Sequence, residues 1–153
     1  ASANCALHFG ARIDFVDIDK DYKNIDIDYL EQKLTKEKKI NKLPKLLISV
    51  HFGGQATYQE KIYRLSKKFG FKILEDASHS LGAKRFNQFV GSSKWSDATV
   101  FSFHPIKTIT SAEGGMVCTN DYSIYEKIKL FRNNGITKNH NNGISSRFRK
   151  KRV

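Results

Sequence analysis

Apolar residues recur at the three- and four-residue spacing of an amphipathic helix in three parts of the chain. The predicted helices cover residues 26–37, 59–70 and 122–134. Asp26 and Asp121 stand at suitable N-cap positions, and Gly70 stands where helices commonly end. The first residues, "ASANCALHFGA", read as part of a further helix that has no start signal before it.

Short runs typical of β-strands lie between these helices. Alternating apolar and polar residues predict a strand over 11–19, and an uninterrupted apolar run predicts a buried strand over 44–52. Three further strands are expected over residues 71–78, 97–104 and 114–120. Strands that alternate with helices favour an α/β fold, in which helices cover both faces of a mostly parallel sheet.

The length and the ends of the chain suggest one domain with a tail. The 153 residues suffice for a single core. We interpret residues 1–135 as that domain and residues 136–153 as a basic, disordered tail. Two alternatives for the tail are a segment that binds nucleic acid or a membrane surface, and an ending that is not the native continuation. Because the chain lacks an initiator Met, we expect it to be an internal piece of a longer protein.

Charge and cysteine content narrow the choice of partners. The net charge of +12 admits nucleic acid, an anionic membrane surface or a phosphorylated ligand, but the lysines follow the solvated faces of the predicted elements. We therefore expect no nucleic-acid partner. No apolar run approaches the roughly 20 residues that cross a membrane, and the first residues lack the pattern of a signal peptide, so we expect neither. Two widely separated cysteines, Cys5 and Cys118, suit reduced thiols in the cytoplasm.

Polar residues follow the ends of three predicted strands. Asp76 and His79 follow the strand core 71–75, Ser102 and Lys107 follow the core 98–101, and His51 follows the core 46–50. In parallel α/β sheets, ligands bind beyond the carboxyl ends of the strands. The first two groups would share one crevice if their strands are neighbours in the sheet.

A lysine near an acid in a partly desolvated crevice suits Schiff-base chemistry, because burial disfavours the charged ammonium. Plain structural roles remain open: Lys107 could extend from a strand end to solvent, Asp76 could cap a turn, and His79 could be a half-buried histidine with its hydrogen bonds made. A metal site is a further alternative, although the necessary ligand spacing is missing. Its candidate ligands would be His51, His79, His104 and Cys118.

Two stretches carry a resemblance to a known family. They are "EDASHSLGA" (75–83) and "VGSSKWSDATVFSFHPIKTITSAEGGMVCTND" (90–121). Together they resemble the central signature of the DegT/StrS-type sugar aminotransferases, which depend on pyridoxal 5'-phosphate (PLP) and have the fold-type I architecture. The likeness extends from residue 1 to "LFRNNGITK", which ends at residue 138.

The resemblance implies a role for each candidate residue. Lys107 would anchor the cofactor covalently and carry the proton that moves during transamination. Asp76 would face the pyridine nitrogen and keep it protonated, and His79 would lie near the phenolic oxygen of the ring. Ser102 would bind the phosphate. No metal is implied.

The resemblance also implies substrates and assembly. The chain is most similar to the branch that aminates C4 of UDP-linked 4-keto-6-deoxy-N-acetylhexosamines in pseudaminic acid synthesis, with L-glutamate as amino donor and a homodimer as the full-length form. The family's phosphate-binding Gly-Thr loop and its small carboxyl-terminal domain are not found in these residues, so we expect residues 1–153 alone to be inactive. Two rivals remain open, a non-catalytic relative that binds cofactor or nucleotide, and a flavodoxin-like domain with a basic tail.

Overall fold

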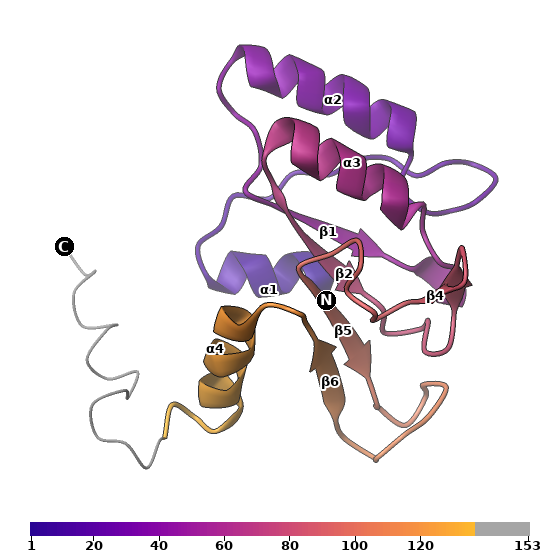
Figure 1. Cartoon of the computed structure of the whole chain (residues 1–153), viewed down its shortest axis with the longest axis vertical. Helices are drawn as coiled ribbons and strands as arrows, with labels where there is room; N and C mark the ends of the chain where they lie inside the picture. Colours follow the sequence, from indigo (N-terminus) through magenta and orange to yellow (C-terminus); the bar gives the residue numbers. More distant parts are fainter. Residues whose placement is uncertain (137–153) are drawn as a thin grey trace.

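A computed structural model describes residues 1–136 of the chain, and its centre is a four-stranded sheet in the order β1-β2-β5-β6 (Figure 1). Strands β1, β2 and β5 run parallel, and β6 is antiparallel to β5. This confirms the predicted α/β fold with a mostly parallel sheet. The bounds of these strands are β1 Leu46–Val50, β2 Lys72–Asp76, β5 Ala98–Ser102 and β6 Gly115–Cys118.

Helices cover both faces of the sheet. Helices α2 and α3 lie side by side on one face, and α1 lies against the other (Figure 1). The Asp26 side chain caps α2, the Asp121 side chain caps α4, and Gly70 ends α3 in the left-handed conformation, as predicted. The bounds are α1 Ser2–His8, α2 Ile27–Lys39, α3 Gln59–Phe69 and α4 Tyr122–Arg132. Shorter elements are the 3-10 turn η1 Phe52–Gly54 and the hairpin strands β3 Lys84–Arg85 and β4 Gln88–Phe89.

The hydrophobic core lies between the sheet and the pair α2–α3. Its members include the apolar stripes that the helical spacing predicts, together with alternate residues of β1 and β2. The buried cluster comprises Leu30, Leu34, Leu47, Ile62, Leu65, Phe69, Phe71 and Ile73. Alternate residues of β2 therefore face α3, and those between them face α1.

The strand predicted over residues 11–19 is wrong. This segment forms no strand, and its one β-pairing within residues 1–136 is an isolated bridge between Ile18 and Ile25. A strand is stabilised by a neighbour along its length, and alternation of side chains alone does not provide one. Phe15 is 68% exposed, while Val16 packs against the core.

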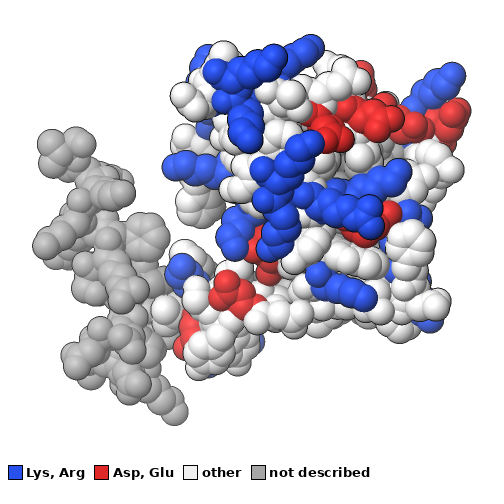
Figure 2. All heavy atoms as spheres, turned by 45° about the horizontal axis from the view of Figure 1, so that its top comes forward, with Lys and Arg blue, Asp and Glu red and all other residues white. Residues whose placement is uncertain are grey.

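The remaining features concern the surface and the tail. On the face in Figure 2, Lys and Arg are spread widely and interrupted by Asp and Glu. Cys5 and Cys118 are both free. Among the helices that the structure describes, none is long and apolar enough to cross a membrane. The predicted tail lies outside the described residues except for Ile136.

Candidate active site at the carboxyl edge of the sheet

Asp76 and Ser102 are brought together at one edge of the sheet, as their positions after two strands predict. Asp76 is the last residue of β2 and pairs in register with Val100 of β5, two residues before Ser102. The next backbone N–H, that of Ala77, donates to the Val100 carbonyl oxygen at 2.8 Å. Neighbouring parallel strands thus present both side chains beyond their carboxyl ends, where α/β sheets bind ligands.

The Asp76 carboxylate is half-buried and receives three hydrogen bonds. Ser2 Oγ donates to Oδ2 at 2.5 Å, while Ser78 donates to Oδ1 through Oγ at 2.6 Å and through its backbone N–H at 3.2 Å. Burial raises the pKa of Asp76, but the hydrogen bonds from Ser2 and Ser78 outweigh it, and the pKa is lowered below its usual value. Asp76 is therefore held as an anion at the sheet edge.

Lys107 lies in the loop that joins β5 to β6 and leaves the same edge. The loop is closed at its base, where the Phe103 N–H donates to the Gly114 carbonyl oxygen at 2.9 Å and the Ser111 N–H donates to the Phe103 carbonyl oxygen at 3.0 Å. A turn centred on Pro105 is closed by the Lys107 N–H, which donates to His104 O at 2.9 Å. Lys107 is half-buried, and its ammonium group has no hydrogen-bond or ion-pair partner among residues 1–136. No contact within these residues therefore occupies the side-chain nitrogen of Lys107.

His79 and Ser102 complete the set of predicted residues at this edge. His79 is exposed in the turn that follows Asp76, and its carbonyl oxygen packs against Gly54, where an added Cβ would lie only 2.7 Å away. Ser102 is half-buried, and its Oγ accepts a hydrogen bond from the His104 N–H at 3.4 Å. A phosphate bound at Ser102 would have to replace only this one long hydrogen bond.

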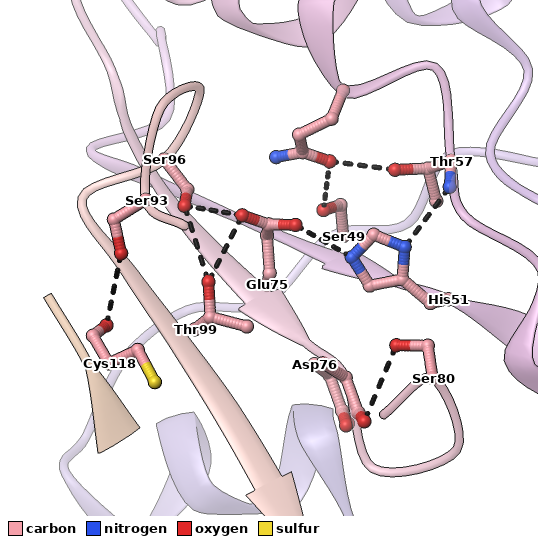
Figure 3. Close-up of polar contacts among 12 residues, drawn as sticks. Ser49, His51, Thr57, Glu75, Asp76, Ser80, Ser93, Ser96, Thr99 and Cys118 are labelled. Carbon is pink, nitrogen blue, oxygen red and sulfur yellow. Dashed lines mark hydrogen bonds and ion pairs between the residues drawn. The ribbon is translucent and has the colours of Figure 1, made fainter. Parts of the chain in front are cut away.

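His51, which also follows a strand, is directed elsewhere. Its ring is 1% exposed and is turned to the α3 side of the sheet, where Nε2 lies 2.8 Å from Glu75 Oε2 (Figure 3). No group of three metal-binding side chains occurs within the part of the chain that the structure describes, so the alternative metal site gains no support. The His51 side chain therefore belongs to the buried interior of the domain and not to the sheet edge.

The partners of Asp76 and the buried contacts of Glu75 were not identified from the sequence. Ser78 had a local signal, since an aspartate followed two residues later by serine is typical of a side-chain-capped turn. Ser2 lies 74 residues away from Asp76 in the sequence, so only the fold could reveal that contact.

Comparisons with known proteins identify relatives of the chain. A profile described as the DegT/DnrJ/EryC1/StrS aminotransferase family matches residues 1–149. The chain is 43% identical over 139 residues to a UDP-4-amino-4,6-dideoxy-N-acetyl-beta-L-altrosamine transaminase of Campylobacter jejuni, covering 90% of the chain and 35% of that relative. A transaminase of the same name from Helicobacter pylori is 43% identical over 138 residues, covering 90% of the chain and 34% of the relative. The chain thus spans about a third of the length of these relatives.

Solved structures give the same picture. Helicobacter pylori PseC, described as an aminotransferase involved in the biosynthesis of pseudoaminic acid, matches with a TM-score of 0.79 and 41% identity over 93% of this chain and 36% of that one. A Brucella abortus aminotransferase matches with a TM-score of 0.84 and 28% identity over 94% of this chain and 38% of that one.

A third solved structure concerns the cofactor. It is a putative sugar aminotransferase from Streptococcus pneumoniae in its PLP form, which matches with a TM-score of 0.72 and 28% identity over 91% of this chain and 39% of that one. PLP is the cofactor of this family, and an anionic carboxylate such as Asp76 is the group that a protonated pyridine ring requires. Because the family profile covers nearly all of the sequence, the chain belongs to the DegT/DnrJ/EryC1/StrS aminotransferase family.

Proposed function

We propose that the protein containing this chain is a PLP-dependent aminotransferase that acts on a nucleotide-linked 4-keto-6-deoxy sugar. The observation that carries the proposal is the Asp76 carboxylate, held ionised by Ser2 and Ser78 beside the strand that leads to Lys107. The family match supports the reaction class, and the two transaminase relatives support a UDP-linked N-acetylated sugar as substrate.

Four residues of the chain would hold the cofactor. The Ser102 hydroxyl would donate to its phosphate, His79 would lie near its phenolic oxygen, and Asp76 would accept a hydrogen bond from its ring nitrogen. Lys107 would be its covalent anchor. Bound PLP supplies an electron sink and a carbonyl carbon that accepts the amino group.

The residues of the chain would control protons around that cofactor. When it is not joined to the cofactor, Lys107 Nζ would be a base that removes a proton from one carbon and returns it to another. The Asp76 carboxylate would keep the ring nitrogen protonated, because loss of the proton from that nitrogen would break a charge-assisted hydrogen bond to the half-buried anion. The two residues would thus divide proton transfer and charge stabilisation between them.

The amino donor and the assembly belong to the same proposal. We propose L-glutamate as donor, a homodimer as the full-length form, and a cytoplasmic location, which the free thiols of Cys5 and Cys118 suit. Large apolar side chains that a second copy would cover include Phe9, which is 83% exposed, and Ile106, which is 80% exposed. Light scattering on the full-length protein measures the oligomeric state directly.

The decisive experiment supplies the full-length protein with PLP, L-glutamate and a UDP-linked 4-keto-6-deoxy-N-acetylhexosamine, and measures formation of 2-oxoglutarate and of the amino sugar. We expect both products in equal amounts. Replacing L-glutamate by L-alanine or L-aspartate in parallel reactions tests the donor separately. Cofactor binding without turnover by any donor would favour the non-catalytic relative, and absence of cofactor binding would contradict the whole proposal.

A further inference from the structure

A buried polar cluster lies on the side of β2 opposite to Asp76. We name its members, His51, Glu75, Ser96 and Thr99, the Glu75 cluster (Figure 3). His51 is 1% exposed, Glu75 4% and Thr99 0%. Buried polar groups of this kind are costly to retain unless every hydrogen bond is made. The hydrogen bonds of the cluster therefore have to offset its burial.

The hydrogen bonds fix the tautomer of His51. The backbone N–H of Thr57 donates to His51 Nδ1 at 3.0 Å, so Nδ1 carries no proton. The ring proton is on Nε2, which donates to Glu75 Oε2 at 2.8 Å. Glu75 Oε1 accepts from Thr99 Oγ1 at 3.1 Å and from Ser96 Oγ. Three donors thus converge on the Glu75 side chain.

His51 holds the end of β2 at two points. Its side chain binds Glu75, and its backbone N–H donates to the carbonyl oxygen of Asp76 at 3.0 Å. Glu75 and Asp76 are consecutive residues of a strand, so their side chains point to opposite faces (Figure 3). Fixing the Glu75 side chain on one face therefore fixes the direction in which Asp76 leaves the other.

The surroundings leave this end of β2 little room to rotate. The turn after His51 contacts the turn after Asp76 closely enough that an added Cβ at Gly54 would lie 2.7 Å from His79 O. Asn24 is 4% exposed and fastens the first of these turns, since its Oδ1 accepts from the Phe52 N–H at 2.9 Å and its Nδ2 donates to Gln55 O at 3.1 Å. The Glu75 cluster is thus part of a rigid support behind the sheet edge.

We propose that His51 and Glu75 are positioning residues, which hold the Asp76 carboxylate in the orientation that the cofactor ring nitrogen needs. The proposal rests on the proposed function, because it takes the role of Asp76 from there. Neither residue would need to touch the cofactor, because Glu75 precedes Asp76 in β2 and His51 binds the carbonyl oxygen of Asp76.

Two substitutions separate the two hydrogen bonds of the His51 ring. His51→Gln places an amide N–H where Nε2 was and keeps the donor to Glu75, whereas His51→Asn places an acceptor where Nδ1 was and keeps only the bond from Thr57. Ile62→Val is the matched control, because Ile62 is fully buried in the core and contributes no polar group to the cluster. Thr99→Val, which removes one donor to Glu75 without changing side-chain volume greatly, replaces His51→Asn if that variant does not fold.

The measurements use the full-length protein. The first is the dissociation constant for PLP, and the second is the titration of the Asp76 carboxyl carbon by ¹³C NMR without cofactor, with the signal assigned by Asp76→Asn. For His51→Asn we expect PLP affinity to fall about tenfold, as for the loss of one hydrogen bond to a charged group, and the pKa of Asp76 to move toward its ordinary value. His51→Gln and Ile62→Val should leave the Asp76 titration unchanged.

The outcomes distinguish this proposal from the proposed function. An unaltered Asp76 titration in both His51→Asn and Thr99→Val would overturn the positioning role. A change of the Asp76 pKa in His51→Gln and Ile62→Val as large as that in His51→Asn would overturn it too. If the unsubstituted protein does not bind PLP, the proposed function fails, whereas the titration without cofactor still decides whether the Glu75 cluster orients Asp76.

Discussion

Ser2 and Asp76 are joined by a hydrogen bond of 2.5 Å, in which the Ser2 hydroxyl donates to Oδ2 of the carboxylate. The contact ties the start of helix α1 to the end of β2, at the sheet edge where the candidate site lies. It also links the ionisation of Asp76 to a residue far from it in the sequence. Removing this hydroxyl tests whether Ser2 stabilises the ionised form of Asp76 and, through it, the folded protein.

We expect Ser2→Ala to reduce stability in a pH-dependent way. The pKa of Asp76 is lowered in the folded protein, so its contribution is present above the unfolded value of 3.8 and is lost as the pH falls through the folded value. Loss of one donor should lower the free energy of unfolding near pH 7 by about 0.5–1 kcal/mol, allowing for partial solvent screening, and the difference should vanish in acid.

Urea unfolding between pH 2 and pH 7 measures this effect. Ser123→Ala is the control, because the Ser123 side chain lies on exposed helix α4 and only its backbone N–H takes part in the cap. A difference between Ser2→Ala and the unsubstituted protein that does not depend on pH would show that Ser2 does not stabilise the ionised form of Asp76.

Asp76→Asn should separate cofactor binding from turnover. The amide keeps the shape of the side chain but cannot hold a proton on the ring nitrogen, while the proposed covalent anchor, Lys107, is unchanged. We expect PLP still to bind and transamination to slow by about a hundredfold, which corresponds to about 3 kcal/mol in the transition state. Single-turnover kinetics with glutamate provide the measurement, and near-normal rates would refute the role of Asp76.

Lys107 should carry the cofactor. Reduction of the PLP-loaded full-length protein with borohydride, followed by peptide mapping, should find the pyridoxyl group on Lys107. Two other lysines serve as internal controls, because each lies against an aromatic ring. Lys84 Nζ is 4.3 Å from the centre of the Phe89 ring, and Lys94 Nζ is 5.2 Å from the centre of the Trp95 ring. Modification of either of them in place of Lys107 would contradict the assignment.

Gly54→Ala should destabilise the turn that supports the site. The residue has φ of +87°, and an added Cβ would lie 2.7 Å from the His79 carbonyl oxygen. Gly53 has φ of +60° with no atom within 4 Å of an added Cβ, so Gly53→Ala is a matched control for the backbone cost alone. We expect about 1 kcal/mol for Gly53→Ala and about 2–4 kcal/mol for Gly54→Ala in urea unfolding. Equal losses would mean that the close contact with His79 is absent.

The sequence predicted the elements whose signals are local. The apolar stripe of α3 and its closing Gly70 follow from spacing and residue type, and the order of helices and strands indicated the α/β fold. The strand over 11–19 failed because alternation describes side chains and not hydrogen-bond partners, and none runs along this segment within residues 1–136. Strand pairing is a property of the whole fold.

The sequence predicted the positions of some residues of the candidate site, but not their long-range contacts. Asp76 and Ser102 could be placed at one edge because parallel strands end together, and the structure confirms that β2 and β5 are neighbours. The contacts of Ser2, and of His51 with Glu75, join residues distant in the sequence and depend on how the strands and helices pack. The roles of Asp76, Lys107, His79 and Ser102 stay predictions.

The alternation of Glu75 and Asp76 along β2 makes the domain sensitive to errors during folding. A slip of β2 by one residue would exchange the two faces, so Asp76 would enter the space of the Glu75 cluster and Glu75 would face α1. Asp76, shorter by one methylene, would not reach the donors of His51 and Thr99 at their present distances, and its charge would be buried without them. A chain with this register error would therefore lose both the hydrogen bonds of its interior and the carboxylate at its binding edge. Molecules that cannot bind the cofactor would then also be the less stable ones.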